Sequence, residues 1–132
     1  MKLIGPINSG DSTGGAGLST ANANTTTIVS GVIYGIYIKY NGSPPAGTTD
    51  VVISTTGTSP APPSNTILTI TDSATAAWYY PRHVVHDETG TAITYDGTRD
   101  VHQAVPIHDT VNVKIDQAND ADSIDVWLLL ED

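Results

Sequence analysis

The sequence predicts an all-β domain in which two antiparallel sheets pack as a sandwich, and three observations carry this prediction. The chain has 132 residues, which is long enough for one domain with a hydrophobic core of its own, and it has no cysteine, so no disulfide can form. Aliphatic residues and threonine are abundant, phenylalanine is absent, and twelve glycines and eight prolines interrupt the sequence, so strands joined by turns are favoured over helices. Several stretches alternate apolar and polar residues with the period of two that is typical of strands. A small closed β-barrel is the alternative architecture.

Residues 1–27 are expected to form an extended arm, and residues 28–132 the sandwich domain. Residues 8–27 are rich in Gly, Ser, Thr and Asn, and Leu18 is their one large apolar side chain. Fixing about twenty backbones costs roughly 20 to 40 kcal/mol of conformational entropy, whereas burying one leucine returns about 2 kcal/mol. We therefore expect the arm to become ordered on a neighbouring subunit or another protein; packing along its own domain through backbone hydrogen bonds is the alternative. The side chains expected to contact a partner are Leu18, Thr20, Asn22, Asn24 and Thr26.

The strongest strand signal lies at residues 25–40, where apolar side chains occupy both faces. About thirteen extended residues span roughly 43 Å, which exceeds the usual length of a strand. A bend or bulge at Gly31 or Gly35 is therefore expected to divide this segment between the two sheets.

The rest of the chain predicts shorter strands separated by turns. They are expected at residues 51–56, 66–71, 76–87, 91–95 and 98–105. Three prolines at residues 57–65 predict a surface loop or an edge between the first two of these strands, and Pro81 marks an edge or a bulge because proline donates no ladder hydrogen bond. Asp96-Gly97 is a strong hairpin signal, so the last three strands are expected to form a meander.

The last stretch, residues 109–132, predicts an antiparallel hairpin with one apolar face. Val111, Val113 and Ile115 alternate with polar residues, and side chains two apart lie on one face of a strand. After a polar connection the same period returns at Ile124, Val126, Leu128 and Leu130. Together with the earlier segments this gives about eight strands, which suits two packed antiparallel sheets such as a jelly roll.

The net charge of −9 comes entirely from residues 87–132, which hold eleven carboxylates against Arg99 and Lys114. We interpret this excess as a solvated face. Because an acidic surface repels phosphate backbones, direct binding of nucleic acid is not expected. No apolar run approaches the roughly 18 residues that a membrane helix needs, and the first residues are too poor in apolar side chains for a signal peptide, so we expect a protein made in the cytoplasm without a membrane segment.

The titratable residues do not form a pattern typical of an active site or a metal site. His83 and His86 are three apart and point to opposite faces of a regular strand. The connection near residue 120 offers oxygens to calcium, but the spacing and central glycine of an EF-hand loop are missing. A glycine-flanked nucleophile and a phosphate-binding loop are both absent, so we expect no catalytic residue, no cofactor and no enzymatic activity. The oxygens that this connection near residue 120 could offer to calcium belong to Asp116, Asn119, Asp120 and Asp122.

Three consecutive aromatic residues, Trp78, Tyr79 and Tyr80, offer a stacking surface for a sugar. Adjacent strand residues alternate between faces, so the first and third are expected together on one face. We expect Trp78 to lie in the core, as well as Trp127 within its apolar segment. This leaves Tyr79 as the candidate ligand-stacking residue.

Two segments carry a resemblance to a known class of proteins. The run Trp78-Tyr79-Tyr80-Pro81-Arg82 and the closing segment D-x-V-x-V-x-I-D-Q-A-x-D-x-D-S-x-x-V-W-L-L, with the low-complexity arm and the acidic, cysteine-free sandwich, resemble small structural proteins of tailed-phage heads. The similarity covers Ile28 to the C-terminus and is closest to capsid decoration (cement) proteins.

The resemblance implies a non-enzymatic β-sandwich on the virion surface, made in the host cytoplasm. Such a protein binds the outside of an icosahedral shell as a homo-oligomer, often a trimer, and bridges subunits of the major capsid protein against the internal pressure of the DNA. A carbohydrate- or receptor-binding module on a virion surface is the alternative function.

Overall fold

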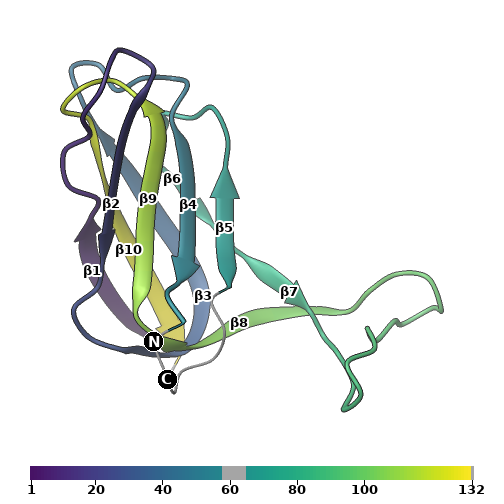
Figure 1. Ribbon diagram of the computed structural model, residues 1–132. Coiled ribbons are helices and arrows are strands. Elements are labelled where there is room, and N and C mark those ends of the chain that lie inside the picture. The colour runs from purple at the N-terminus through teal and green to yellow at the C-terminus, as the bar shows by residue number, and fades with distance from the viewer. Residues whose placement is uncertain (58–64, 132) are drawn as a thin grey trace.

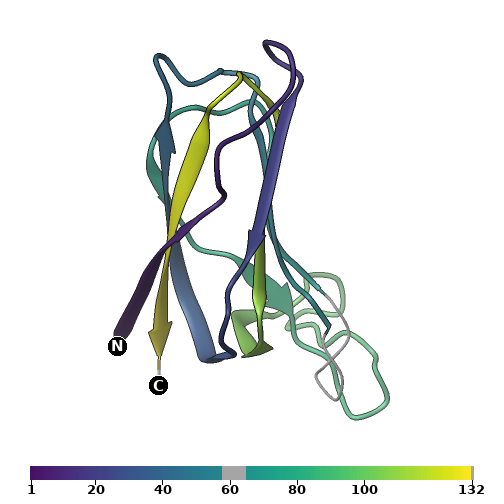
Figure 2. The ribbon, with the colours of Figure 1, turned by 60° about the vertical axis from the view of Figure 1, so that its left-hand side comes forward.

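The computed structural model describes residues 1–57 and 65–131, which form two antiparallel sheets packed face to face (Figures 1 and 2). Within the described residues there are ten strands, no helix and no closed barrel, so the all-β prediction is confirmed and the barrel alternative is wrong. The expected loop at residues 57–65 lies almost wholly outside the described residues. The strands are β1 (Lys2–Asn8), β2 (Ser19–Asn24), β3 (Val29–Asn41), β4 (Asp50–Thr55), β5 (Thr66–Ile70), β6 (Ala77–Tyr79), β7 (Arg82–Val84), β8 (His102–Asp109), β9 (Val111–Ala118) and β10 (Ser123–Glu131).

The order of the strands shows that neighbours in sequence are mostly not neighbours in a sheet. The six-stranded sheet has the order β1-β10-β3-β8-β7, with β6 also paired to β3, and the four-stranded sheet has the order β2-β9-β4-β5. The first four strands therefore alternate between the sheets. All the strand pairs are antiparallel, and the arrangement is consistent with a β-sandwich.

The core lies between the sheets and follows the predicted period of two. Alternate residues of β3, β4, β9 and β10 point inward, and each side chain that does so meets the apolar face of the opposite sheet. The largest fully buried side chains are Ile33, Ile36, Ile38, Val51, Ile53, Val111, Val113, Ile115, Ile124, Val126, Leu128 and Leu130. The apolar faces of the closing segment are thus as predicted.

The predicted pairing of that closing segment is wrong. β9 belongs to the four-stranded sheet and β10 to the six-stranded sheet, so the two strands face each other across the core and do not form a hairpin. Gln117, near the end of β9, and Ala121, in the connection, adopt positive φ angles of 53° and 64° where the chain passes from one sheet to the other. A period of two identifies the buried face of each strand, and both strands bury theirs equally well in either arrangement.

The N-terminal segment packs within the sheets, where the sequence led us to expect an extended arm. β1 pairs with β10 and β2 pairs with β9, so residues 1–27 supply one edge strand to each sheet. Between them, Ser9 donates its amide to the carbonyl of Ile124 at 3.0 Å, and Ser12 donates to the carbonyl of Asp122 at 2.7 Å. Backbone hydrogen bonds to two core strands therefore order a segment that buries little apolar surface.

β3 remains in one sheet over its full thirteen residues, so the expected division between two sheets is wrong. A register shift does occur beside Gly35, opposite Leu129 and Leu130, as the sequence predicted. Gly31 has a φ of +140°, and a Cβ there would lie 2.9 Å from the carbonyl oxygen of Glu131. The two halves of β3 pair on their other side with different strands, β8 with the first half and β6 with the second.

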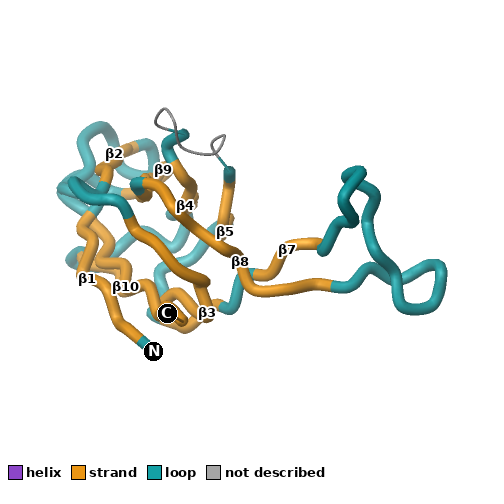
Figure 3. Tube along the Cα trace, turned by 90° about the horizontal axis from the view of Figure 1, so that it is seen from below, coloured by secondary structure: helices purple, strands orange, loops and turns teal. Residues whose placement is uncertain are grey.

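β7 and the first half of β8 carry the six-stranded sheet beyond β3 and lead into a projecting arm, residues 85–101, that points away from both sheets (Figure 3). The predicted three-stranded meander is replaced there by a short ladder and two turns. Three backbone hydrogen bonds link Val85, Ile93 and Val101 in a closed cycle, each donating to one of the others at 2.8 to 2.9 Å. Every residue from 86 to 100 is exposed.

Candidate functional site: an aromatic sheet face and a projecting arm

Aromatic side chains cross the outer face of the six-stranded sheet in a row. Trp127 of β10 pairs with Tyr37 of β3, which pairs in turn with Trp78 of β6. The ring centroids of Tyr37 lie 5.6 Å from Trp127 and 5.3 Å from Trp78, within the range of favourable aromatic pairs. All three alternate with inward-facing core residues, so the strand period itself places them outside.

A second pair of rings continues this row around a glycine. Tyr34 and Tyr80 meet edge to face with centroids 5.9 Å apart, and the Arg82 guanidinium lies 5.5 Å from the Tyr34 centroid. Gly35 leaves room for neighbouring rings, because a Cβ there would lie 3.2 Å from Tyr80 and 3.4 Å from Trp78. We define the aromatic face as Tyr34, Tyr37, Trp78, Tyr80 and Trp127.

This face exposes large apolar side chains to solvent. The exposed fraction is 43% for Trp78 and 56% for Tyr80, and Leu3 and Leu129 extend the same outer side toward β1. Contiguous apolar patches on a protein surface usually mark a contact with another molecule. The aromatic face is therefore the first candidate interaction surface.

The structure inverts the predicted positions of Trp78 and Tyr79. Trp78 and Trp127 were expected in the core, and this expectation is wrong because both lie on the outer face. Tyr79 lies on the inner face, partly buried against the core. The alternation along β10 could have predicted the outward position of Trp127, because this residue lies between the buried Val126 and Leu128.

The five residues expected to contact a partner lie on or beside β2, at the free edge of the four-stranded sheet. Leu18 is 75% exposed, and Thr20, Asn22, Asn24 and Thr26 are exposed as well. Asn112 of β9 donates from Nδ2 to the Oδ1 atoms of Asn22 at 3.2 Å and Asn24 at 2.7 Å. A cleft of about 410 Å³ next to them is lined by amides and hydroxyls, namely Asn24, Ser54, Thr55, Thr56, Asn65, Thr66 and Asn112. This surface is polar and uncharged.

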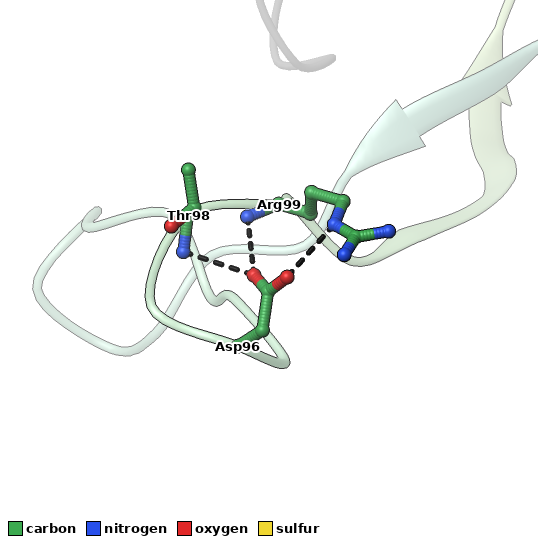
Figure 4. A network of polar contacts seen from close by, with 3 residues as sticks. All are labelled: Asp96, Thr98 and Arg99. Atoms are coloured by element: carbon green, nitrogen blue, oxygen red, sulfur yellow. Dashed lines mark hydrogen bonds and ion pairs between the residues drawn. The ribbon is translucent and has the colours of Figure 1, made fainter.

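The two turns of the projecting arm are each organised by one aspartate. Asp96 Oδ1 accepts hydrogen bonds from the amides of Thr98 at 3.0 Å and Arg99 at 2.6 Å, and its Oδ2 accepts from Arg99 Nε at 2.8 Å (Figure 4). Asp87 Oδ1 accepts from the amides of Thr89 at 2.9 Å and Thr91 at 3.0 Å. These bonds favour the ionised carboxylates, so the amides of Thr91 and Arg99 are the main causes that lower the pKa of Asp87 and Asp96 respectively.

Acidification is expected to open both turns of the arm while the sheets stay folded. A lowered pKa in the folded turn means that its stabilisation is complete above the unfolded value of about 4 and is lost as the pH falls through the folded pKa. An NMR titration of backbone amides from about pH 6 to pH 2 should show the resonances of Thr91 and Arg99 moving together with the carboxyl carbons of their aspartates. Midpoints at or above the ordinary aspartate pKa would contradict the assigned hydrogen bonds.

The residues considered for metal binding serve other contacts. Asp122 is buried, and its Oδ2 accepts hydrogen bonds from the amides of Ala46 and Asn119, both at 3.0 Å. Asp116 is 3.2 Å from Lys114 Nζ, and His83 lies 3.0 Å from the Gln103 amide nitrogen. Among the described residues, no group of three or more His, Cys, Asp and Glu side chains is placed to hold a metal ion. None of the described residues forms a helix of the length and hydropathy that crossing a membrane requires.

Comparisons with known sequences leave the chain without a family assignment. No protein-family model matches it, and no curated protein has a detectably similar sequence.

Proposed function

We propose that this chain is a non-enzymatic structural protein of a virion that binds the outer surface of a phage capsid and stabilises the shell by bridging subunits of the major capsid protein. The observation that carries the proposal is the projecting arm. Its residues 86–100 are all exposed although hydrogen bonds order their turns, so the arm has the form of an element built to contact other chains. The aromatic face at its base adds a second uncovered surface.

The strand order supports the finer fold class that the sequence predicts. The order β1-β10-β3-β8 facing β2-β9-β4-β5, with β6 and β7 inserted after the fifth strand, supports the proposal of an eight-stranded jelly roll. Jelly rolls recur in viral capsid proteins and in lectins. Since one fold serves many functions, this likeness raises the prior for a virion protein without specifying its contacts.

The surfaces fit the physical demands of a brace. A brace needs a rigid body and several separate contacts, because simultaneous weak contacts multiply in strength when they are held on one frame. The two packed sheets supply the rigid body, and the uncharged β2 edge, from Leu18 to Thr26, lies on the opposite side of the sheet order from β7. One copy thus presents contacts at both edges, as bridging requires. We propose that the protein acts as a homo-oligomer, with a trimer favoured.

Shells that lack this protein are expected to lose resistance to heat and osmotic shock, and added purified protein should restore it. The measurement is release of packaged DNA as a function of temperature, with and without the protein. A variant with Thr20, Asn22 and Asn24 changed to lysine tests the β2 edge, since three cations alter the neutral surface without touching the core. Unchanged resistance of the depleted shells, together with no binding of the protein, would sink the proposal.

A carbohydrate-binding module is the second candidate, and the exposure of Trp78 and Tyr80 favours it. Both rings pack beside Gly35 on the outer face, where aromatic side chains are accessible to the apolar side of a sugar ring. A glycan array probed with the protein and with Trp78→Ala distinguishes the two functions. Glycan binding that disappears in this variant, with no shell binding, would favour the module.

A further inference from the structure

The projecting arm is ordered by hydrogen bonds but buries little apolar surface within its own chain. Fixing each backbone costs roughly 1 to 2 kcal/mol, and burial of apolar side chains is the main compensation. None of residues 86–100 is buried, and the arm leaves Ile93 39% exposed and Tyr95 64% exposed. Apolar side chains on an arm of this kind become buried only against another molecule that offers a matching surface.

The charges of the described residues indicate where that surface lies. Two of the five cations are already paired, Arg99 with Asp96 and Lys114 with Asp116. The other three, Lys2, Lys39 and Arg82, have no recorded ion pair among the described residues, and all three belong to strands of the six-stranded sheet. On the arm, the carboxylates without a recorded cation partner are Asp87, Glu88 and Asp100.

No ion pair is seen between these two sets among the described residues, and the arm points away from both sheets (Figures 1 and 3). They are complementary between chains, since an acidic arm with exposed apolar side chains matches an apolar face that is flanked by Lys39 and Arg82. A contact between two arms would bring acidic tips together, and a contact between two faces would leave the arms exposed. When the arm of one copy contacts the aromatic face of another, the carboxylates of the arm come close to the cations of the face, and the apolar side chains of both surfaces become buried.

We propose that the projecting arm of one copy binds the aromatic face of a second copy, head to tail. Ile93 and Tyr95 supply the apolar contact against Trp78 and Tyr80, and the acidic arm lies toward Lys39 and Arg82 of the other copy. A head-to-tail contact uses different surfaces on its two sides, so it closes into a ring when the rotation between copies permits. The proposal deepens the proposed function and rests on it only in assigning the ring to a capsid surface. The self-association itself is tested without any capsid.

The test is sedimentation velocity of the purified chain and of two variants. The arm variant carries Ile93→Asn and Tyr95→Asn, and the face variant carries Trp78→Ala. Each is expected to weaken self-association by at least about 30-fold, as loss of a central aromatic contact does. The far-UV circular dichroism should stay that of the unchanged chain and thermal unfolding should remain cooperative, because the arm lies outside the core and Trp78 lies on the outer face.

Mixing the two variants gives the decisive result. The face variant retains an intact arm and the arm variant retains an intact face, so an equimolar mixture is expected to form one-to-one dimers and no rings. A chain that stays monomeric at about 100 µM would overturn the proposal, as would association that both variants leave unchanged. Mixtures in which both variants remain monomeric would overturn it as well. Loss of shell binding with rings intact would instead count against the proposed function alone.

Discussion

Replacing Leu128 by alanine is expected to lower the free energy of unfolding by about 3 to 5 kcal/mol. Leu128 is fully buried in the middle of β10, where it pairs with Ile4 of β1 on one side and Ile36 of β3 on the other. Truncation removes the transfer free energy of the side chain and leaves a cavity between two sheets that cannot collapse, because strands fixed by ladders on both sides resist movement. Urea unfolding followed by tryptophan fluorescence measures the loss.

The matched control is Leu129→Ala, one position along the same strand. Leu129 points to the outer face and is partly exposed, so the same deletion is expected to cost about 1 kcal/mol or less. The difference between the two variants reports the face that each residue occupies. Equal losses would contradict the register of β10 against β3.

Replacing Asp122 by alanine is expected to cost about 2 to 4 kcal/mol. Its carboxylate accepts the amides of Ala46 and Asn119, and so ties the loop after β3 to the connection between β9 and β10. Asp122 is only 4% exposed, so removing its carboxylate leaves two amide donors without their acceptor. Thermal and urea unfolding measure the effect, and Asp122→Asn, which keeps one oxygen acceptor, should lose less.

Asp120→Ala is the matched control in the same connection, because Asp120 is exposed and no hydrogen bond from its side chain is recorded among the described residues. Its effect is expected to stay within about 0.5 kcal/mol. Unfolding curves recorded with a chelator and with added calcium test the loop for metal-dependent stability. A larger loss for Asp120→Ala than for Asp122→Ala would contradict the structural role assigned to Asp122.

The sequence predicted the fold class well and the strand partners poorly, for a physical reason. Alternation along β10 identifies which side chains are buried, because that property belongs to each strand separately. The pairing of β1 with β10 depends on residues more than a hundred positions apart, and no local pattern encodes it. The N-terminal segment was expected to need a partner because its conformational entropy was compared with side-chain burial alone. The structure orders this segment through backbone ladders to β9 and β10.

The candidate site shows the same division. The aromatic residues at 78–80 stood out in the sequence, but the inward face was assigned to the wrong ring because burial of tryptophan was taken as the default. Whether Trp78 or Tyr79 faces inward is decided by the register of β6 against β3, and that register is set by tertiary contacts. The projecting arm was predicted as strands and turns of the sheet, since a ladder that leaves a sheet and one that remains in it share the same pattern of residues.

The position of β10 has a consequence for how the protein folds during its synthesis. This strand lies between β1 and β3, which leave the ribosome long before it, so neither can complete its ladder until residues 123–131 have emerged. Contacts of such long sequence separation make folding slow, because the loops must close before the contacts form. We therefore expect the sheets to assemble in one late, cooperative step, and a ribosome-bound chain that ends before β10 to remain sensitive to protease over all its strands.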